Sequence, residues 1–336
     1  MYAALAKLVK DFRPDVAHFH NIWYLVSPSA FHACRNAAVP VVQTLHNFRI
    51  FCVNGLLMRN GSVCEDCLGR MPWRGALGRC FRQSFLYSLP LAAAQMFHRA
   101  GGAWRNCVDQ YIALTDFARN KLIQGGLPAE RVTVKPNFLP DPPAPRYAPG
   151  EHILFVGRLT PEKGAGVLVE SVDRLVEGGL FGEKVKIVGD GAQRAALQSQ
   201  AQHRGNGELI EFVGRKPHRE VIELLEDAKF IVIPSTCYEM FPLACIEAFA
   251  CGKPVVAARL GALAEIVRDG ETGLLFQPGE AVDLARKMRF LLDNEEVRLE
   301  MGRRARAEFE AKYTAAQNYK MLMDIYRQAI EQSRGR

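Results

Sequence analysis

The sequence contains no apolar run long enough to cross a membrane and no recognisable nucleic-acid-binding motif. Residues 2–12 have the apolar spacing of an amphipathic helix, and they lack the pattern of a signal peptide. The nine cysteines are scattered apart from one cluster, unlike the disulfide framework of a secreted protein. These absences predict a cytoplasmic chain that is neither exported nor embedded in a bilayer.

Positive charge is concentrated in the first half of the chain. Residues 1–150 contain 17 Lys and Arg against 8 Asp and Glu, a net charge of +9, whereas residues 151–336 contain 26 against 28, a net charge of −2. A basic half of this kind suits an anionic membrane surface, a nucleic acid or a phosphorylated acceptor. Because no nucleic-acid motif accompanies the charge, we expect no nucleic-acid partner. Contact of the basic half with an anionic membrane would place the protein peripherally at the inner face of the plasma membrane, which is the location we expect.

Short apolar strands alternate with helical segments along most of the chain, which predicts an α/β fold with two Rossmann-like, doubly wound domains. The first domain is expected at residues 1–140, followed by a proline-rich linker at 141–150. The second domain is expected at residues 151–310. A last helix within 311–336 returns toward the first domain, and one stripe of it carries Tyr319, Leu322, Met323, Tyr326 and Ile330.

An irregular insertion at residues 48–82 contains four cysteines, Cys52, Cys64, Cys67 and Cys80. Cys64 and Cys67 form a Cys-x-x-Cys pair, and two further thiols within reach would complete a structural, tetrahedral Zn²⁺ site. Such a site would brace a loop that lacks a core. The two outer spacings are loose, so unpaired thiols in an irregular segment are the alternative.

An apolar helix at residues 84–98 is expected to be interrupted at Pro90. Arginine and tryptophan flank this helix at Trp73, Arg74, Arg79, Arg82, Arg99, Trp104 and Arg105. The combination is typical of an interfacial membrane contact. Packing of the helix in the core is the alternative.

The stretch from residue 230 to residue 258 predicts a strand, a loop, a helix and a second strand. Every residue between Leu243 and Cys251 is apolar except Glu247, so this buried carboxylate needs a partner or a polar ligand. Glu239 lies in the loop before the helix. In a parallel sheet this loop is at the carboxyl edge, where ligands bind, and the free amides of the helix start suit a phosphate. A helix-flanking acid and a core glutamate bonded to a hydroxyl are the alternative.

Two more loops are expected at the same edge. The first contains Gly157, Arg158 and Lys163, and the second contains Gly189 and Gly191, where the backbone can approach a ligand closely. Two cations, a glycine turn and a helix start around one crevice predict a diphosphate site that needs no Mg²⁺ to neutralise charge. Taken singly, each loop is equally a solvated or tight turn.

These motifs resemble those of retaining glycosyltransferases of the GT-B fold, family four. The resemblance rests on Phe-Val-Gly-Arg-Leu-Thr-Pro-Glu-Lys-Gly at 155–164, the pair Glu239 and Glu247, Ala-Cys-Gly-Lys-Pro-Val-Val at 250–256, and Asp-Gly-Glu-Thr-Gly-Leu-Leu at 269–275. In the first half, His-Phe-His-Asn at 18–21 and Thr-Leu-His-Asn at 44–47 are similar to the family's motifs, and the cysteine insertion is similar to that of a subgroup of polysaccharide-assembly enzymes.

The resemblance implies transfer of a sugar from a UDP- or GDP-sugar to an acceptor hydroxyl, with retention at the anomeric carbon. The acceptor would be a glycan or a lipid-linked acceptor in bacterial surface polysaccharide or glycolipid assembly. Catalysis would need no cofactor beyond this donor. A nucleotide-binding fragment without turnover and a nucleotide-sugar epimerase of the same fold are the alternatives.

The resemblance also implies roles for individual residues. Arg158 and Lys163 would hold the donor diphosphate, and Glu247 would take the ribose hydroxyls. Glu239 would bind the donor sugar and steady the reacting centre, while His46 would approach the transferred sugar. The other donor-binding residues that the resemblance implies are Gly157, Gly189, Gly191, Arg215, Phe241, Leu243 and Thr115.

The start of the chain departs from the family's pattern. The family's chains usually open with a strand and a glycine-rich loop, whereas this chain begins at what resembles the helix before the fourth strand. An N-terminally truncated, incomplete first domain is therefore expected. Met240 and Ala262 stand where glycines are usual.

Overall fold

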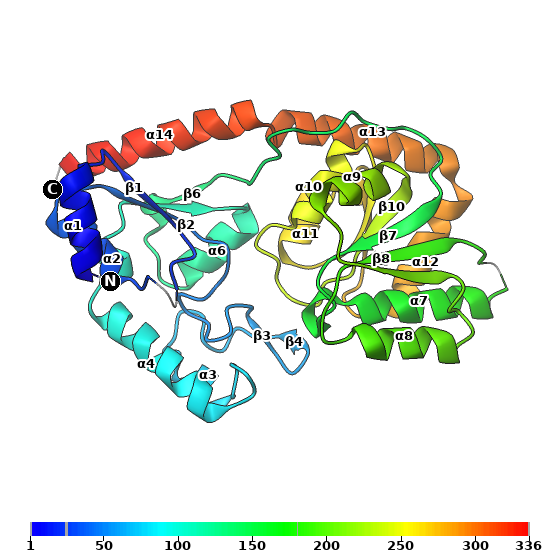
Figure 1. The fold of residues 1–336 in the computed structure, drawn as a ribbon, viewed down its shortest axis with the longest axis horizontal. Coiled ribbons are helices and arrows are strands. Elements are labelled where there is room, and N and C mark those ends of the chain that lie inside the picture. Colours follow the sequence, from blue (N-terminus) through cyan, green and yellow to red (C-terminus); the bar gives the residue numbers. More distant parts are fainter. Residues whose placement is uncertain (1, 24–25, 180, 335–336) are drawn as a thin grey trace. The chain divides into compact units, whose positions relative to one another are not determined.

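A computed structural model of the protein describes residues 2–23, 26–179 and 181–334 (Figure 1). The chain forms two compact units, which are considered separately below. Unit 1 consists of Met1–Pro136 and Ala316–Arg336, and unit 2 consists of Asn137–Ala315. None of the described helices combines the length and the apolar character needed to cross a bilayer.

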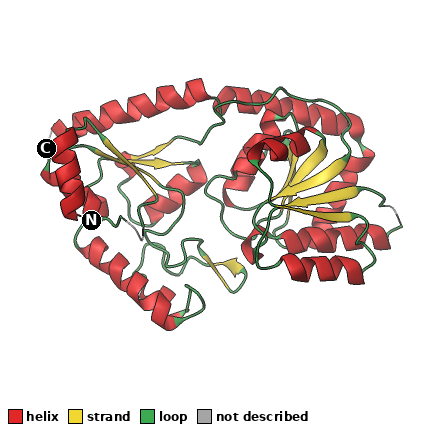
Figure 2. Ribbon diagram, viewed as in Figure 1, coloured by secondary structure: helices red, strands yellow, loops and turns green. Residues whose placement is uncertain are grey.

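Unit 2 is built on a six-stranded parallel sheet with the order β12-β11-β10-β7-β8-β9 (Figure 2). Helices cover both faces of this sheet, so its strands are runs of Val, Ile, Leu and Phe with few exposed side chains. The predicted doubly wound α/β fold is confirmed. The strands are β7 (His152–Val156), β8 (Lys184–Val188), β9 (Ile210–Gly214), β10 (Ala228–Ile233), β11 (Val255–Ala258) and β12 (Gly273–Phe276).

The helices of unit 2 form one layer on each face of the sheet (Figure 1). On one face, α7 (Ala165–Glu177) packs against α8 (Arg194–His203) and α12 (Ala281–Asp293). On the other, α10 (Leu243–Ala250) packs against α9 (His218–Glu226) and α13 (Glu295–Lys312), and α11 (Gly261–Ile266) follows β11. A one-turn 3-10 helix, η2 (Pro161–Lys163), precedes α7.

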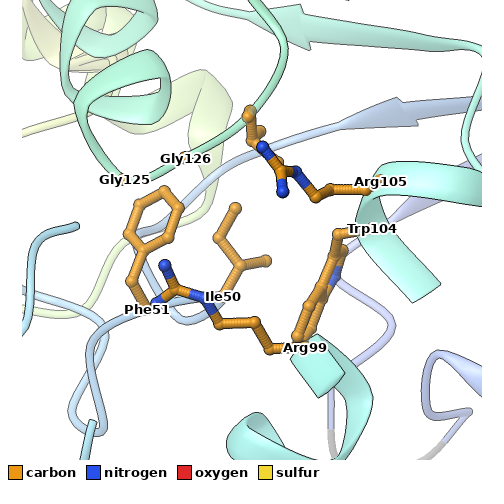
Figure 3. A pocket seen from close by; sticks show the side chains of 8 residues that line it. Ile50, Phe51, Arg99, Trp104, Arg105, Gly125 and Gly126 are labelled. Carbon is orange, nitrogen blue, oxygen red and sulfur yellow. The ribbon is translucent and has the colours of Figure 1, made fainter. Parts of the chain in front are cut away.

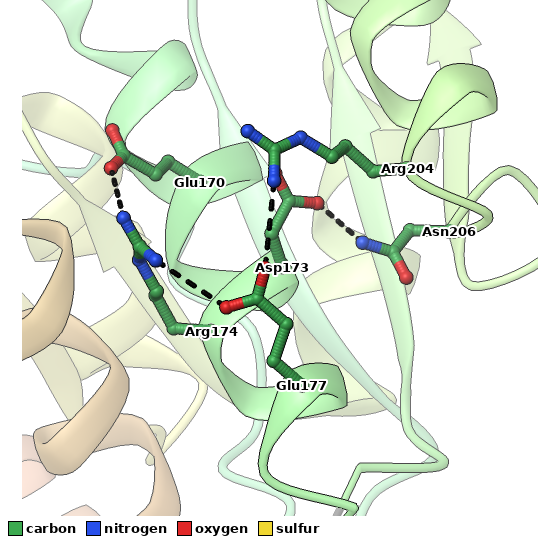
Figure 4. Close-up of polar contacts among 6 residues, drawn as sticks. All are labelled: Glu170, Asp173, Arg174, Glu177, Arg204 and Asn206. Carbon is green, nitrogen blue, oxygen red and sulfur yellow. Dashed lines mark hydrogen bonds and ion pairs between the residues drawn. The ribbon is translucent and has the colours of Figure 1, made fainter.

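Polar contacts connect α7 to the turn between α8 and β9 (Figure 4). Asn206, in the turn, donates to the buried carboxylate of Asp173. On the solvent side, Arg174 lies within 3.4 Å of Glu170 and 3.3 Å of Glu177, and Arg204 lies 3.5 Å from Glu177. Because exposed ion pairs contribute little, we assign the stabilising part of this network to the buried Asn206–Asp173 bond.

Unit 1 is built on a four-stranded parallel sheet with the order β1-β2-β5-β6. Its strands are β1 (Ala17–His20), β2 (Val41–Thr44), β5 (Gln110–Ala113) and β6 (Val132–Val134), the last preceded by the 3-10 turn η1 (Ala129–Arg131). The helices of this unit include α1 (Tyr2–Phe12), α2 (Ser29–Asn36), α5 (Ala103–Asn106) and α6 (Asp116–Gln124). Parallel pairing throughout places the carboxyl ends of all four strands at one edge.

The insertion between β2 and β5 contains the short pair β3 (Met58–Arg59) and β4 (Ser62–Val63), then α3 (Trp73–Leu77) and α4 (Phe85–Ala100). The prediction that the apolar helix is interrupted at Pro90 is wrong, because α4 continues through this residue. The carbonyl of Leu86, which Pro90 leaves without its amide, belongs to a residue that is 79% exposed. The bond that Pro90 removes therefore lies on a solvent-facing part of the helix.

The long helix α14 (Ala315–Arg334) lies largely in unit 1. Its buried side chains are Asn318, Ile325 and Ala329, whereas Tyr319 is 66% exposed. The predicted stripe is therefore wrong at Tyr319, whereas its other members, Leu322, Met323, Tyr326 and Ile330, are half-buried. Asn318 faces the core because its Oδ1 accepts a hydrogen bond from the buried Lys135 Nζ at 3.1 Å.

Candidate functional site

Three loops at the carboxyl edge of the unit 2 sheet pack backbone against backbone. Gly164, at the start of α7, has φ +70°, and a Cβ there would lie 1.9 Å from the carbonyl oxygen of Pro234, after β10. Gly189, after β8, has φ +139°, and a Cβ there would lie 1.8 Å from the carbonyl oxygen of Gly157, after β7. Both positions therefore require glycine, and their close approach fixes the cationic loop beside its neighbours.

Lys163 and Glu239 are in contact within this group of loops. Lys163 Nζ donates to Glu239 Oε1 at 2.6 Å, and Ser235 Oγ donates to the same oxygen at 2.7 Å. Both charged side chains are largely shielded, with exposures of 26% and 13%. Sequence reasoning assigned the two residues to one site without predicting that they touch.

Arg158 is placed differently from Lys163. Its side chain is 68% exposed, and its Nη2 lies 3.3 Å from Glu162 Oε1. An exposed ion pair of this kind is weak, so the guanidinium can turn toward an incoming anion at little cost.

Glu247, in α10, has a partner that the sequence did not predict. Its Oε1 accepts a hydrogen bond from His218 Nε2 at 2.9 Å. Glu247 is mostly shielded, with 12% of its side chain exposed, whereas His218 is 64% exposed. The expectation that this carboxylate needs a polar partner is therefore met by the first residue of α9.

These side chains border two cavities that meet at Val156, Gly157 and Arg158. One cavity, of about 370 Å³, is lined by Lys163, Glu239, Phe241, Leu243 and Glu247 among others. The other, of about 590 Å³, is lined by Gly189, Gly191 and Arg215 among others. The structure thus brings together the ten predicted residues of unit 2, while their individual roles remain predictions.

The two cavities differ in chemical character. The first combines a lysine with carboxylates and with the start of α10, whose first amides have no acceptor within the helix. It therefore suits a ligand with both anionic groups and hydroxyls. The second is walled by glycine backbone and by Val188 and Val221, with Arg215 and Lys216 beside them. It therefore offers a ligand apolar side chains and glycine backbone beside two cations.

The predicted site residues of unit 1 lie at the carboxyl edge of its own sheet. His46 Nε2 lies 2.8 Å from His20 Nδ1, and the rings are stacked. Burial, followed by the charges of His20 and Lys135, lowers the pKa of His46 to about 4, so its imidazole is neutral near pH 7. Thr115 is buried and caps α6, accepting from the amide of Ala118 at 3.1 Å.

A second histidine contact ties α14 to the same edge. His18 Nδ1 lies 2.8 Å from Tyr326 Oη, and His18 Nε2 lies 2.7 Å from Thr44 Oγ1. Burial and then His20 lower the pKa of His18 to about 4 as well. These contacts hold the ring of His18 beside that of His20, at 4.4 Å between centroids.

The predicted zinc site receives no support from the structure. Among the described residues, no group of three or more His, Cys, Asp or Glu side chains is arranged to hold a metal ion. Cys52, Cys64, Cys67 and Cys80 are near one another as free thiols, and Cys52 Sγ donates to Asn54 Oδ1 at 3.0 Å. Burial, then the proximity of Cys52, raises the pKa of Cys67 to about 12, so this thiol stays protonated.

Sequence reasoning missed two polar side chains of the unit 2 site. Ser235 lies two residues after the end of β10, at the carboxyl edge of the sheet. Because ligands bind at this edge, its position could have marked Ser235 as a candidate. His218 opens α9 behind Pro217, and nothing local connects it to a glutamate 29 residues further on.

Comparisons with known proteins agree with this fold. Residues 1–137 match the family model of a glycosyl transferase 4-like domain, and residues 144–308 match that of glycosyl transferases group 1. The two halves of the chain therefore each match a glycosyl transferase domain model, and the fold is GT-B.

Two curated relatives and one solved structure illustrate the similarity. An uncharacterised glycosyltransferase of Methanocaldococcus jannaschii is 35% identical over 161 residues, which are 48% of this chain and 43% of that protein. The glycogen synthase of Mycobacterium tuberculosis is 30% identical over 310 residues, 90% of this chain and 66% of the enzyme. The chain thus spans less than two thirds of either relative. The HepE protein of Anabaena, solved with UDP-glucose, has a TM-score of 0.70 at 20% identity, covering 96% of this chain and 81% of that one.

Proposed function

We propose that the protein transfers a sugar from a nucleoside diphosphate sugar, such as a UDP- or GDP-sugar, to an acceptor hydroxyl with retention of the anomeric configuration. One observation carries this proposal, the joined cavities in which Lys163, Arg158 and the start of α10 lie beside Glu239 and Glu247. Such a donor needs both kinds of group, because its phosphates are anionic and its two sugar rings carry hydroxyl donors. The UDP-glucose bound to HepE supports the same class of ligand.

The roles follow from charge. Arg158, Lys163 and the first amides of α10 bind the diphosphate, and Glu247, oriented by His218, binds the ribose hydroxyls. Glu239 binds hydroxyls of the transferred sugar. The nucleobase lies in the larger cavity, beside Gly189, Gly191 and Arg215.

The donor phosphate competes with Glu239 for the ammonium group of Lys163. An arriving phosphate has to share or displace the ammonium that Glu239 holds at 2.6 Å. Once the phosphate takes this cation, Glu239 is released to accept hydrogen bonds from the donor sugar. Loading of the donor therefore prepares the carboxylate for its own role.

In the reaction, the bond between the anomeric carbon and the diphosphate oxygen breaks while a bond to the acceptor oxygen forms on the same face. The leaving diphosphate gains negative charge and accepts the proton of the acceptor hydroxyl. Arg158, Lys163 and the α10 amides stabilise this charge more strongly in the transition state than in the ground state. Glu239 stabilises the positive charge that develops at the anomeric carbon.

We assign two residues of unit 1 to the same reaction. His46, neutral near pH 7, exchanges hydrogen bonds with the transferred sugar without adding a charge. Thr115, at the start of α6, contributes a contact to the phosphate or the sugar of the donor substrate.

The acceptor side is assigned from the surface of α3 and α4. Residues 67–108 contain six arginines and no Asp or Glu. Large apolar side chains on this stretch are 40–79% exposed, at Met71, Trp73, Leu77, Phe85, Leu86, Tyr87, Leu89 and Phe97. Arginine beside exposed aromatic and aliphatic side chains suits an anionic membrane surface. We therefore assign a membrane-held glycan or lipid-linked acceptor, as in surface polysaccharide or glycolipid assembly.

The proposal is tested by screening UDP- and GDP-sugars for a rise in melting temperature, because a ligand of the folded state stabilises it. The stabilising donor is then incubated with membrane lipid extracts, and the anomer of the product is assigned by NMR. We expect one donor to stabilise the chain and to give a product of unchanged configuration. An inverted product contradicts retention, and stabilisation without any product contradicts transferase activity of this chain.

A further inference from the structure

Unit 1 contains a cavity that none of the roles above uses (Figure 3). Its volume is about 270 Å³, and it is lined by Ile50, Phe51, Arg99, Trp104 and Arg105 together with residues 125–127. These residues come from the insertion after β2, from α4 and α5, and from the turn after α6.

Two guanidinium groups point into this cavity from different helices (Figure 3). Arg99 belongs to the last turn of α4, and Arg105 belongs to α5. The nearest partner of Arg99 is a carbonyl, since its Nη1 donates to the oxygen of Arg70 at 2.8 Å. Within the part of the chain that the structure describes, neither arginine pairs with a carboxylate. Two like charges directed into one space repel, and an anion between them removes this cost.

The walls of the cavity are apolar and tightly packed. Phe51, Trp104 and Leu127 are buried, with 4–6% of their surface exposed. A Cβ on Gly125 would lie 2.3 Å from the ring of Phe51, so the ring rests directly on this backbone. The backbone of Trp104 is fixed by a hydrogen bond that Tyr111 Oη donates to its carbonyl oxygen. The aromatic wall of the cavity is therefore held in place by the surrounding packing.

Volume and chemistry together limit the ligand. A cavity of about 270 Å³ is smaller than the usual range for a nucleotide-sized molecule and accommodates a head group with a few carbon atoms. The arginines require an anion, and their planar forks match phosphate oxygens. The aromatic and aliphatic walls require an apolar body attached to it.

We propose that this cavity binds a phosphate monoester carried on an apolar chain. Arg99 and Arg105 hold the phosphate, and the chain lies against Ile50, Phe51 and Trp104. Arg99 is on the same helix as the exposed Leu86 and Phe97, so an amphiphile drawn from a membrane at α4 has a short path to it. This binding does not rest on the proposed function, because the ligand carries no alcohol hydroxyl to which a sugar could be transferred.

Isothermal titration calorimetry of the full chain tests the proposal with octyl phosphate, octyl glucoside and inorganic phosphate, each below micelle-forming concentrations. We expect octyl phosphate to bind at least about tenfold more tightly than octyl glucoside, which lacks the charge. It should exceed inorganic phosphate, which lacks the apolar chain, by at least about the same factor. The variant R99A/R105A should lose this preference. The matched control R13A/R35A, which removes the same charge from exposed positions outside the cavity and outside the α3 and α4 surface, should keep it.

Equal binding of octyl phosphate by the wild type and R99A/R105A overturns the proposal, and so does inorganic phosphate binding as tightly as octyl phosphate. If the double variant does not fold, Arg105→Glu replaces it, because Arg105 is exposed. This reversal of charge should also remove the preference for octyl phosphate over octyl glucoside. Titration of UDP into the same samples reports on Arg158 and Lys163 instead. Failure of this cavity is therefore separable from failure of the donor site.

Discussion

Lys163 and Glu239 are 76 residues apart in the chain, and their side chains meet at 2.6 Å beside the start of α10. A cation and an anion that both face a ligand cavity hold each other in place until the ligand arrives. The predictions below begin with this pair.

Glu239→Gln should separate donor binding from catalysis. Removing the carboxylate frees Lys163 for the phosphates and removes one negative charge near them, so the diphosphate should bind about threefold more tightly or unchanged, as expected for a partly exposed pair. Transfer should fall at least about 100-fold, because the developing positive charge loses its partner. Calorimetry with UDP or GDP and a product assay measure the two effects. Weaker diphosphate binding together with unchanged transfer contradicts the assignment.

Gly164→Ala should destabilise unit 2 through a steric contact. Its Cβ would lie 1.9 Å from the carbonyl oxygen of Pro234, and φ is +70°, so we expect a loss of about 3 kcal/mol or more in the free energy of unfolding. Gly279→Ala is the matched control, since φ is +80° there and nothing lies within 4 Å of the new Cβ. The control should lose only about 1 kcal/mol. Urea denaturation of both variants measures the difference, and equal losses would show that the contact is unimportant.

Acid should destabilise unit 2 through His152. This side chain is 1% exposed in β7, its Nε2 donates to the carbonyl of Leu224 at 3.1 Å, and burial lowers its pKa to about 4. In the unfolded chain His152 has a pKa near 6.5, so between about pH 6.5 and pH 4 it binds a proton there but not in the folded chain. Stability is therefore complete above about pH 6.5 and falls toward pH 4, by about 2 kcal/mol at pH 4.5.

His152→Gln keeps an N–H donor for Leu224 and has no titrating group. The difference between its unfolding free energy and that of the wild type should therefore change by this amount between about pH 7 and about pH 4.5. A pH-independent difference, measured by urea titration, contradicts the role of His152.

The exposed apolar face of α4 should drive binding to anionic vesicles. Leu86 and Phe97 are 79% and 74% exposed, so L86E/F97E is expected to fold normally. Its affinity for phosphatidylglycerol vesicles should drop at least about tenfold, because two apolar contacts are replaced by charges that the membrane repels. L8E/F12E, at exposed positions of α1, is the control and should bind like the wild type. Sedimentation with vesicles gives the comparison; identical binding of both variants removes the membrane assignment.

Local patterns in the sequence were sufficient to predict the sheet of unit 2 and the edge at which the proposed ligand-binding residues lie. Buried runs such as residues 230–233 predict parallel strands, and parallel strands place their following loops at one edge. The contacts inside the site were not predictable in this way. The contacts of Glu247 with His218 and of Lys163 with Glu239 depend on how separate segments pack together. The hydrophobic periodicity of the sequence does not report on this packing.

The remaining errors have related causes. The periodicity of α14 predicts most of its shielded face correctly, but the bond between Asn318 and Lys135 places the polar Asn318 in the core and leaves Tyr319 exposed. Pro90 stays inside α4 because the bond that it removes lies on a solvent-facing part of the helix. Cysteine spacing alone suggested zinc, whereas the placement of the thiols depends on the surrounding insertion.

The central claim is that Arg158 and Lys163 bind the diphosphate of a nucleotide-sugar donor. Calorimetry should compare UDP with UMP, or GDP with GMP if guanine is preferred, in the wild type and in R158A/K163A. We expect the diphosphate to bind at least about tenfold more tightly than the monophosphate in the wild type, and this advantage to vanish in the variant while it still unfolds in one cooperative transition. A diphosphate advantage of the same size in R158A/K163A would contradict the account.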